Sequence, residues 1–416
     1  MPIIGSQGAG TKGAPTAPTI GTATVTNSTT VSLTFTAPSF SKLPITSYTV
    51  TSSPSISLST SGSSSPLTVT GSFVTDQSYT FTVVANHANG SSTASSASNS
   101  TIPSPNTYAG YSIGGYSSTT VGITGIDKIA FSNDAISALA ATLSSGRYYA
   151  SNLSNSGVAG YIGGGNTSIS AIASIEKLTF SSEARSNVSA TYGTARGDSH
   201  GAMSNSGTAG YAGGGINGSG GVLNSIDKIL YSNDTTSTLS AVLPWSTYGR
   251  RRNPGTANSG TAGYTFGGYN YPEPLDGGVL GNTATILKLA FSGETTSKLA
   301  AELTDRMNEM AAFSNNGVAS IISGGSGGGA NFNKFTYSNE TRSITSLYSS
   351  AGRSMTQGGM AHSGVAGYIV GEYRGAVEYM IHPGKYLFSN DTFSYLSGSL
   401  TTGTYATTGI ANSGTL

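Results

Sequence analysis

The chain has 416 residues, enough for two or three domains, and only 9% of them are charged, so that 19 basic and 18 acidic residues leave a formal net charge of +1. This balance offers no basic surface for nucleic acid or an anionic membrane, and we expect neither as a partner. No cysteine is present, which excludes disulfide bonds, thiolate metal sites and a cysteine nucleophile. No apolar run approaches the roughly 20 residues of a membrane span, and the N-terminus lacks a signal-peptide core. We therefore expect a protein that is neither secreted nor membrane-bound.

Residues 1–14 are rich in glycine and show no hydrophobic periodicity. Two interpretations fit this composition: a flexible leader, or a docking peptide that becomes ordered on an assembly partner.

Residues 15–104 alternate apolar and polar side chains in short runs separated by Pro, Ser and Gly, a pattern typical of a β-sandwich. In Val31–Pro38, for example, every second residue is apolar and is expected to face the opposite sheet. The strands are predicted at 19–25, 31–36, 45–52, 66–70, 78–86 and 91–98.

This segment resembles a fibronectin type III domain over nearly its whole length. The resemblance is carried by Ala17-Pro-Thr19, Val31–Pro38, Ile45–Val50 and Ser78–Ala85. It implies that Tyr79 is the corner tyrosine whose hydroxyl bonds back to the chain, whereas Phe35 stands where the family usually has tryptophan. Such domains are spacers or adhesion modules without chemistry of their own. Thr101–Asn106, with two prolines, is predicted to be a semi-rigid linker.

The rest of the chain is built from repeats of the stretch Asn205–Gly215, Asn-Ser-Gly-Thr-Ala-Gly-Tyr-Ala-Gly-Gly-Gly. Copies aligned on its tyrosine fall at Tyr111, Tyr161, Tyr211, Tyr264, Ile321 and Tyr368, which gives intervals of 50, 50, 53, 57 and 47 residues. In the third copy, strands are predicted at 199–204, 208–212, 226–231 and 236–243. Four antiparallel strands in about 50 residues are typical of a propeller blade.

Paired glycines after an apolar strand, together with an arginine before the next first strand, make this region similar to kelch repeats. The arginines are Arg147, Arg196, Arg250, Arg306 and Arg353, and the glycine pairs begin at Gly114, Gly164, Gly214, Gly267 and Gly324. The sixth copy departs with Gly371-Glu372, and the family's tryptophan late in the blade is missing. Copper oxidases that share this propeller need a cross-linked cysteine, which this chain lacks.

The two ends of the repeat region are incomplete in complementary ways. It opens at Tyr108 in a second strand, and it closes with residues 404–414, a first strand with nothing after it. We therefore expect the C-terminal strand to pair beside residues 108–115. The predicted fold is all-β: a leader (1–14), a fibronectin type III-like β-sandwich (15–104), and a six-bladed kelch-like β-propeller (105–416) that the C-terminal strand closes.

Eleven of the 19 basic residues, six lysines and the five repeat arginines, recur at fixed repeat positions. Each third strand carries a lysine (Lys128, Lys177, Lys228, Lys288, Lys334 and Lys385), and each following turn carries an acid (Asp134, Glu183, Asp234, Glu294, Glu340 and Asp391). Identical placement in every copy favours turn and inter-blade hydrogen bonding, because a catalytic pocket needs asymmetry.

Sequence motifs for chemistry are weak in this chain. Gly110–Gly114 and Gly197–Gly201 both match G-x-S-x-G, but neither is beside a predicted helix, which that motif requires. Arg196-Gly-Asp198 matches an integrin tripeptide, but Arg196 already has the repeat position, and we interpret the match as coincidence. The four histidines lack metal-ligand spacing. We predict no metal, no cofactor and no catalytic residue.

The repeats differ from one another mainly in the loops after the second strands and in the loops between blades. In a propeller, these loops lie on one face. Aromatic rings beside arginine, asparagine and carboxylates suit stacking on sugars or a protein hot spot, although ordinary loop packing explains them as well. The predicted ligand-binding residues are Trp245, Tyr248, Arg250, Arg251, Tyr269, Tyr271, Tyr373 and Arg374.

The combination of a glycine-rich leader, an adhesion-like sandwich and divergent blades resembles structural proteins of tailed bacteriophages. This resemblance implies a non-enzymatic virion fibre or appendage, assembled in the host cytoplasm and released by lysis. The N-terminal region would bind other virion proteins, and the propeller would bind a host-surface glycan or protein. The resemblance also implies a homo-oligomer in the particle. Two alternatives stay open: a head-decoration or neck protein, and a polysaccharide-degrading enzyme using Glu273 with Asp276 or Glu372 with Glu378.

Overall fold

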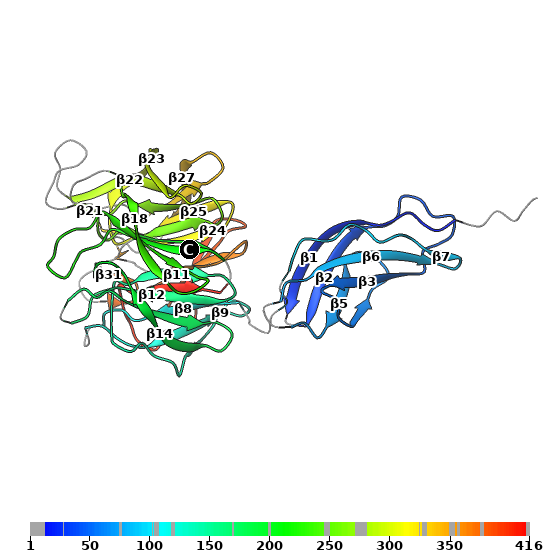
Figure 1. The fold of residues 1–416 in the computed structure, drawn as a ribbon, viewed down its shortest axis with the longest axis horizontal. Helices are drawn as coiled ribbons and strands as arrows, with labels where there is room; N and C mark the ends of the chain where they lie inside the picture. Colours follow the sequence, from blue (N-terminus) through cyan, green and yellow to red (C-terminus); the bar gives the residue numbers. More distant parts are fainter. Residues whose placement is uncertain are drawn as a thin grey trace, which may run out of the picture. The chain divides into compact units, whose positions relative to one another are not determined.

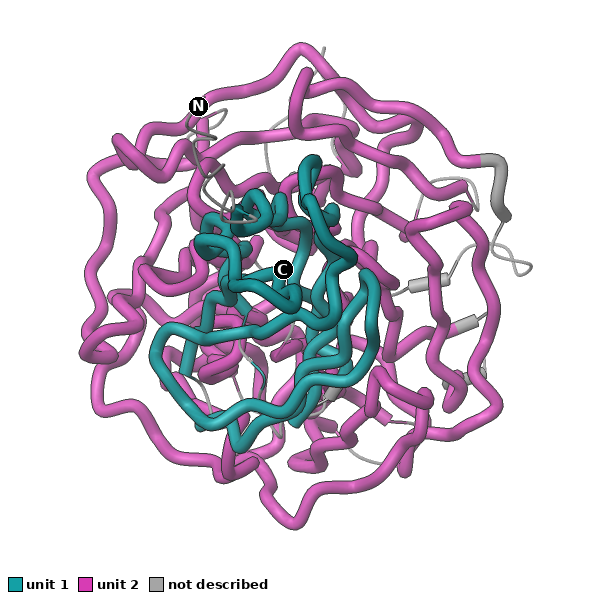
Figure 2. The backbone as a smooth tube through the Cα atoms, turned by 90° about the vertical axis from the view of Figure 1, so that its right-hand side faces the viewer, with its two compact units in different colours: residues 1–107 teal, residues 108–416 magenta. Residues whose placement is uncertain are grey.

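The computed structural model describes residues 13–27, 29–74, 77–101, 103, 108–117, 121–168, 170–198, 201–244, 250–270, 281–323, 325–326, 331–348, 354–355, 358–374 and 378–412. The chain divides into two compact units, Met1–Thr107 and Tyr108–Leu416 (Figures 1 and 2). Every regular element in the described ranges is a strand, which confirms the all-β prediction. No helix that could cross a membrane is found in these ranges. The predicted leader lies, up to residue 12, outside them.

The first unit consists of two antiparallel sheets. One has the order β1 (Thr19–Asn27), β2 (Thr30–Thr36), β5 (Leu67–Gly71), β4 (Leu58–Ser61), and the other the order β3 (Ser47–Ser53), β6 (Thr80–His87), β7 (Gly90–Ser91). Alternate residues of each sheet are buried, and both sheets contribute to a single hydrophobic core that includes Val31, Leu33, Phe81 and Val83. The alternation seen in the sequence therefore produces the buried face of each sheet.

Tyr79 is buried, and its hydroxyl accepts a hydrogen bond from the Val74 amide at 3.0 Å. The expected bond from this hydroxyl back to the chain is thus present.

The strand expected at 91–98 is wrong: β7 ends at Ser91. Ser92, Ser95 and Ser98 instead dock on β6 through paired bonds, in which each serine amide donates to a β6 carbonyl and each serine Oγ accepts from the amide of the same β6 residue. The contacts recur at every third residue, whereas a strand would present every second. In a regular sheet, a backbone carbonyl of the neighbouring strand would accept the hydrogen bond from each of these β6 amides; here the serine Oγ accepts it.

The second unit contains six larger antiparallel sheets, here numbered in chain order with the innermost strand first. Sheet 1 is β35 (Thr408–Ala411), β8 (Ala109–Ile113), β9 (Ile126–Ala130), β10 (Ala135–Ala138); sheet 2 is β11 (Ser151–Asn155), β12 (Ala159–Gly163), β13 (Ser174–Thr179), β14 (Ala184–Thr191); and sheet 3 is β15 (Gly201–Asn205), β16 (Ala209–Gly213), β17 (Ser225–Leu230), β18 (Thr236–Val242).

Sheet 4 is β19 (Gly255–Asn258), β20 (Ala262–Phe266), β22 (Gly281–Ala290) and β23 (Thr295–Met307), with β21 (Tyr269–Asn270) paired to β22. Sheet 5 is β24 (Ala311–Asn315), β25 (Ala319–Ser323), β26 (Asn331–Thr336), β27 (Thr341–Tyr348), and sheet 6 is β29 (Gly358–His362), β30 (Ala366–Val370), β33 (Gly384–Leu387), β34 (Thr392–Tyr395). A small sheet joins β28 (Ser354–Met355), β31 (Tyr373–Arg374) and β32 (Glu378–Tyr379).

The C-terminal strand completes sheet 1. β35 pairs antiparallel with β8, with Ile410 opposite Tyr111, and the predicted pairing is confirmed. The innermost strands contact one another in the order β11, β15, β19, β24, β29, β35, and β35 also contacts β11. The innermost strands of the six sheets are therefore neighbours in a cycle around a common centre. The second unit is drawn in magenta in Figure 2.

The Asn-Ser-Gly turns connect the first and second strands and bond from sheet to sheet. The Gly207 amide donates to Asn155 Oδ1 of the preceding sheet at 2.8 Å, and the Gly260 amide donates to Asn205 Oδ1 at 2.9 Å. The turn glycine has a positive φ, 77° at Gly207, which side chains rarely adopt. The repeated turn is thus a link between neighbouring sheets.

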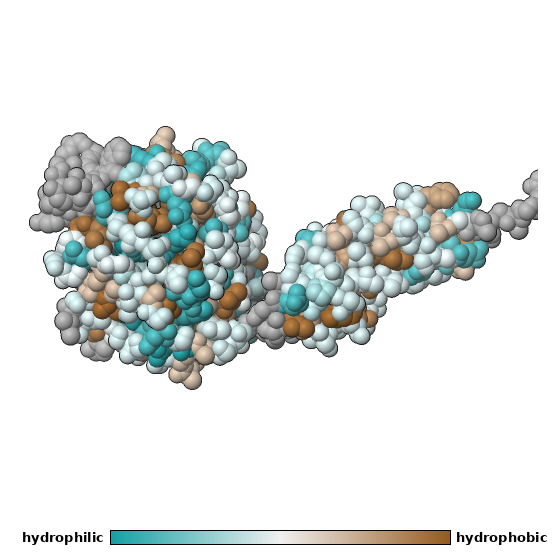
Figure 3. Space-filling view, viewed as in Figure 1, coloured by the Kyte–Doolittle hydropathy of each residue, from teal (hydrophilic) through white to brown (hydrophobic). Residues whose placement is uncertain are grey.

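Six ion pairs link the sheets in a cycle. Each third-strand lysine contacts the hairpin acid of the next sheet, and the last pair, Lys385–Asp134, returns from sheet 6 to sheet 1 at 2.6 Å. The other pairs are Lys128–Glu183, Lys177–Asp234, Lys228–Glu294, Lys288–Glu340 and Lys334–Asp391. This confirms the inter-repeat bonding expected from the charge pattern. The surface in view in Figure 3 is mostly near neutral in hydropathy, as the low charge content implies.

Candidate functional site

In five of the six sheets the described structure includes the segment just before the first strand, and this segment lies at the end of the sheets opposite the Asn-Ser-Gly turns. Five copies of this position have non-glycine residues with φ between 55° and 58°: Tyr149, Asp198, Arg252, Glu309 and Ala406. A left-handed backbone at such residues is unfavourable and persists only where the surrounding structure enforces it. The five copies carry five different side chains, so this end of the unit has an asymmetric chemistry.

Backbone bonds hold these residues in sequence around the centre. The Tyr149 amide donates to the Ala406 carbonyl at 3.0 Å, the Arg252 amide to the Asp198 carbonyl at 2.9 Å, and the Glu309 amide to the Arg252 carbonyl at 3.1 Å. Each bond joins neighbouring sheets. The side chains at this position are therefore presented on a fixed frame.

An ionic cluster occupies the middle of this frame. Arg252 lies between two buried carboxylates, with its Nε 3.2 Å from Asp198 Oδ1 and its Nη1 2.6 Å from Glu309 Oε1. The Tyr149 hydroxyl of sheet 2 donates to Glu309 Oε1 of sheet 5 at 2.9 Å. Sheets 2 and 5 are three apart in a cycle of six, so this bond crosses the centre.

Burial and charge shift the pKa values of this cluster. Burial, with the nearby Glu309 carboxylate, raises the pKa of the Tyr149 hydroxyl well above its ordinary value. Burial alone would lower the pKa of Arg252, but the carboxylates of Asp198 and Glu309 outweigh it and raise that pKa. The tyrosine stays protonated as a hydrogen-bond donor, and the arginine stays charged.

Half-buried tyrosines continue from this cluster over sheets 2, 1 and 6. The ring centroids of Tyr148 and Tyr149 are 5.4 Å apart, those of Tyr116 and Tyr148 5.6 Å, those of Tyr116 and Tyr405 5.1 Å, and those of Tyr373 and Tyr405 5.5 Å. Edge-to-face and tilted contacts of this kind stabilise aromatic clusters, and the half-burial of Tyr116, Tyr148, Tyr373 and Tyr405 leaves part of each residue exposed.

Arg251 extends the cluster on its other side. Its Nη1 lies 2.8 Å from Asp198 Oδ2, and its guanidinium lies over the Tyr269 ring, 5.0 Å from the centroid. Arg251 and Tyr269 also form a backbone bridge. We call the continuous set of side chains the tyrosine–arginine network: Tyr373, Tyr405, Tyr116, Tyr148, Tyr149, Glu309, Arg252, Asp198, Arg251 and Tyr269.

Three of the predicted ligand-binding residues, Arg251, Tyr269 and Tyr373, belong to this network. Arg250 does not: it is only 2% exposed and donates to the carbonyls of Gly267 at 3.1 Å and Thr285 at 3.4 Å. Trp245, Tyr248 and Tyr271 lie outside the described residues, and for Arg374 only the backbone, in β31, is described.

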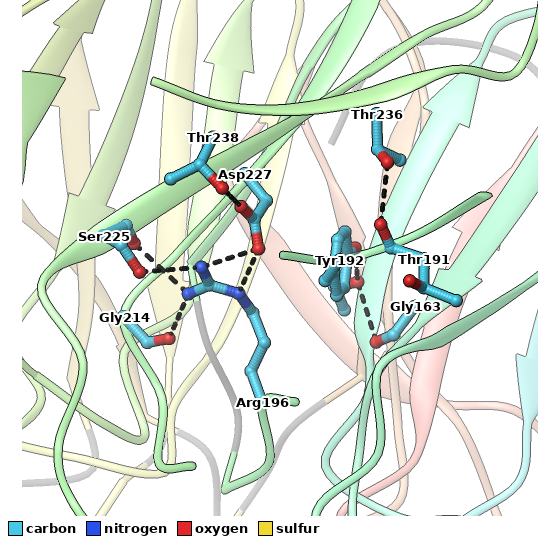
Figure 4. A network of polar contacts seen from close by, with 10 residues as sticks. Gly163, Thr191, Tyr192, Arg196, Gly214, Ser225, Asp227, Thr236 and Thr238 are labelled. Carbon is cyan, nitrogen blue, oxygen red and sulfur yellow. Dashed lines mark hydrogen bonds and ion pairs between the residues drawn. The ribbon is translucent and has the colours of Figure 1, made fainter. Parts of the chain in front are cut away.

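The repeat arginines Arg147 and Arg196 are buried and stabilise the fold through internal hydrogen bonds and ion pairs. Arg196 is fully buried and donates to Asp227 Oδ2 at 2.8 Å, to the Gly214 carbonyl at 2.6 Å and to Ser225 Oγ at 2.9 Å (Figure 4). Arg147 pairs with the buried Glu176 at 2.5 Å. Both arginines satisfy the carbonyls at the end of a second strand, where the glycine pairs turn the chain away.

The sequence analysis missed the residues at the centre of the network, Tyr149, Asp198, Arg252 and Glu309, and three tyrosines beside them. Asp198 was discounted as part of a chance Arg-Gly-Asp match. The signal in the sequence was the asymmetry of the short segment before the first strand, where the aligned copies have Tyr, Asp, Arg, Glu and Ala at one position.

Of the four carboxylates considered for catalysis, only Glu372 has a described side chain. Glu372 is buried and accepts a hydrogen bond from the Tyr395 hydroxyl at 3.1 Å. Glu273 and Asp276 lie outside the described residues, as does the side chain of Glu378. Within the described ranges no group of three or more His, Cys, Asp or Glu side chains could hold a metal ion. The chain matches no protein-family model and no curated protein.

Proposed function

We propose that this protein is a non-enzymatic structural protein of a phage virion, a fibre or appendage, whose second unit binds a host-surface glycan through the tyrosine–arginine network. The N-terminal region would dock on other virion proteins. The observation that supports the binding role is the network itself: a continuous run of aromatic and guanidinium groups that crosses one end of six sheets and has no second copy among the described residues. Rings stack on the apolar faces of sugars, and planar polar groups bond their hydroxyls.

The proposal includes a fold: a six-bladed kelch-like β-propeller preceded by a fibronectin type III-like domain. The cyclic order of the innermost strands, the β35–β8 pairing and the Lys385–Asp134 ion pair support the propeller. The two antiparallel sheets of the first unit and the Tyr79 hydroxyl bond support the fibronectin-like domain.

The state of the two central carboxylates favours binding over catalysis. Asp198 accepts from two arginines, and Glu309 accepts from Arg252 and the Tyr149 hydroxyl. A glycosidase needs one carboxyl group that donates a proton and a second that attacks or activates water. Both carboxylates here are already occupied as ion-pair acceptors.

An array of bacterial O-antigens and capsular polysaccharides of known composition tests this function. We expect binding of the intact protein to at least one polysaccharide, and its loss in Arg251→Ala. Arg342→Ala is the matched control, because Arg342 is also partly exposed and its Nε donates to the carbonyl of Glu302, which is not part of the network, at 2.9 Å. If the intact protein binds nothing on the array, the glycan-binding role is refuted, and a decoration or neck role is favoured. Release of reducing sugar from a bound polysaccharide would establish an enzyme instead.

A further inference from the structure

We infer that the network binds a neutral polysaccharide rather than an anionic one, an inference that rests on the glycan-binding role proposed above. The first argument is the charge of the network. Its ionised groups are Arg251, Arg252, Asp198 and Glu309, so two positive charges meet two negative charges.

The charged groups of the network are already paired with one another. Asp198 and Glu309 are about as buried as core residues, with side chains 5% and 3% exposed, and each contacts a guanidinium group within 3.2 Å. Arg252, 32% exposed, is shared between both. A carboxylate or sulfate on a ligand would have to compete with these internal partners while approaching two buried negative charges. The network therefore has no unbalanced cation for an anionic sugar.

The third argument concerns the groups that remain accessible. Tyr116, Tyr148, Tyr373 and Tyr405 are half-buried, so each of them exposes part of its surface to solvent. The outer edges of the guanidinium groups supply hydrogen-bond donors. Uncharged hexoses match this surface, because they offer apolar C–H faces to the rings and hydroxyl oxygens to the donors.

Nor does the rest of the chain supply a positive field. The formal net charge is +1, and the six repeat lysines are all paired with acids of neighbouring sheets. Long-range steering of an anionic polymer needs an excess of one sign of charge.

The test applies the full chain to the polysaccharide array and then titrates it with the polysaccharide that binds, at about 0.05 M and 0.5 M NaCl. Between these two salt concentrations, screening shortens the range of interactions between exposed charges severalfold. We expect binding to neutral polysaccharides, with an affinity that changes less than about twofold between the two salt concentrations. Tyr116→Ala and Tyr405→Ala should each weaken binding about tenfold, as truncation of an aromatic hot spot does. Tyr116→Phe keeps the ring and should retain most of the affinity.

Tyr48→Ala is the control, because Tyr48 is a partly buried tyrosine of β3 in the other unit. Binding confined to anionic polysaccharides, or an affinity that falls steeply with salt, overturns the inference and leaves the glycan-binding role standing. Full affinity in both Tyr116→Ala and Tyr405→Ala overturns it as well, because the ligand then lies elsewhere. No binding at all refutes the proposed function on which it rests.

Discussion

At the scale of single residues, the glycine of each Ala-Gly-Tyr copy makes room for a side chain of the preceding sheet. A Cβ at Gly210 would meet Leu153 and the Tyr231 hydroxyl, and one at Gly263 would meet Met203. The fifth copy has Ser320 instead, and there the preceding first strand carries only Ala257. The space is filled by polar contacts, with Ser320 Oγ 2.5 Å from Thr256 Oγ1 and 2.8 Å from the Tyr337 hydroxyl.

The close contact between Gly210 and Leu153 predicts that substitutions at these two positions have non-additive effects on stability. Gly210→Ser should lower the free energy of unfolding by about 1–3 kcal/mol, because it overpacks the site. In the double variant, Leu153→Ala removes the side chain that the new serine would meet. The loss of unfolding free energy in the double variant should therefore be smaller than the sum of the two single losses by roughly 0.5–3 kcal/mol. Urea unfolding of all four proteins measures this coupling. Additive effects would contradict the proposed contact.

His362 predicts a pH dependence. It replaces the turn asparagine in the sixth copy, and its ring lies 5.3 Å from Tyr108 and 5.2 Å from Phe131. Burial, followed by the charge of Lys385, lowers its pKa from 6.5, so the folded state resists protonation more than the unfolded chain does. Below pH 6.5 the unfolded state binds more protons, and stability should therefore fall as the pH drops.

The measurement is urea unfolding between about pH 7.5 and pH 5.5, above the range in which most carboxylates titrate. His362→Asn, which restores the residue of the other turns, should remove most of the slope in this range. An equal slope in both proteins would assign the dependence to other groups.

At the scale of elements, β35 completes sheet 1 and packs against its neighbours. Ile410 lies where a Cβ on Gly160 would be, and Asn412 Oδ1 accepts from the Ala109 amide at 2.8 Å. Truncation after residue 403 removes these contacts and exposes the edge of β8. We expect the second unit to lose its cooperative thermal transition, as measured by calorimetry.

The control truncation removes only residues 413–416 and leaves β35 intact. Similar melting of the long truncation and the intact chain would show that sheet 1 is stable without its C-terminal strand, against the proposed ring.

Most of the strands were predictable because the same sequence pattern recurs in every repeat. The strands of the third copy, expected at 199–204, 208–212, 226–231 and 236–243, lie at 201–205, 209–213, 225–230 and 236–242. Docking of Ser92, Ser95 and Ser98 was not predictable, because serine has no strong strand preference and a three-residue spacing resembles a loop.

The candidate site was predicted only in part. Aromatic and arginine residues in the loops pointed to Arg251, Tyr269 and Tyr373. The meeting of Tyr149 with Glu309, 160 residues apart in the chain, depends on how six sheets are placed around a centre. No local pattern carries that information, and the left-handed backbone before each first strand has no glycine to mark it.

At the scale of the whole molecule, the hydroxyls of the second-strand tyrosines join the ion pairs that link the sheets. Tyr161 donates to Asp234 at 2.6 Å, and Tyr368 donates to Asp134 at 2.8 Å. Burial first, and then these carboxylates, raise the pKa of both hydroxyls above 10.0. The same holds for Tyr111, Tyr211 and Tyr264.

A raised tyrosine pKa predicts alkaline unfolding. Stability from these groups is complete below the unfolded pKa of 10.0 and is lost as the pH rises toward the folded values, because the unfolded chain then releases protons that the folded state retains. Several tyrosines should ionise together with the loss of structure, so phenolate absorbance and circular dichroism should change over one pH range. Full ionisation of the tyrosines with native circular dichroism would contradict this account.

Tyrosine nitration mapped by mass spectrometry tests whether the tyrosine–arginine network contacts a polysaccharide. The intact protein is nitrated with and without a polysaccharide identified on the array. The account predicts that bound polysaccharide protects Tyr116, Tyr148, Tyr373 and Tyr405, while Tyr48 in the other unit reacts equally in both samples. Unchanged nitration of those four tyrosines in the saturated complex would contradict it.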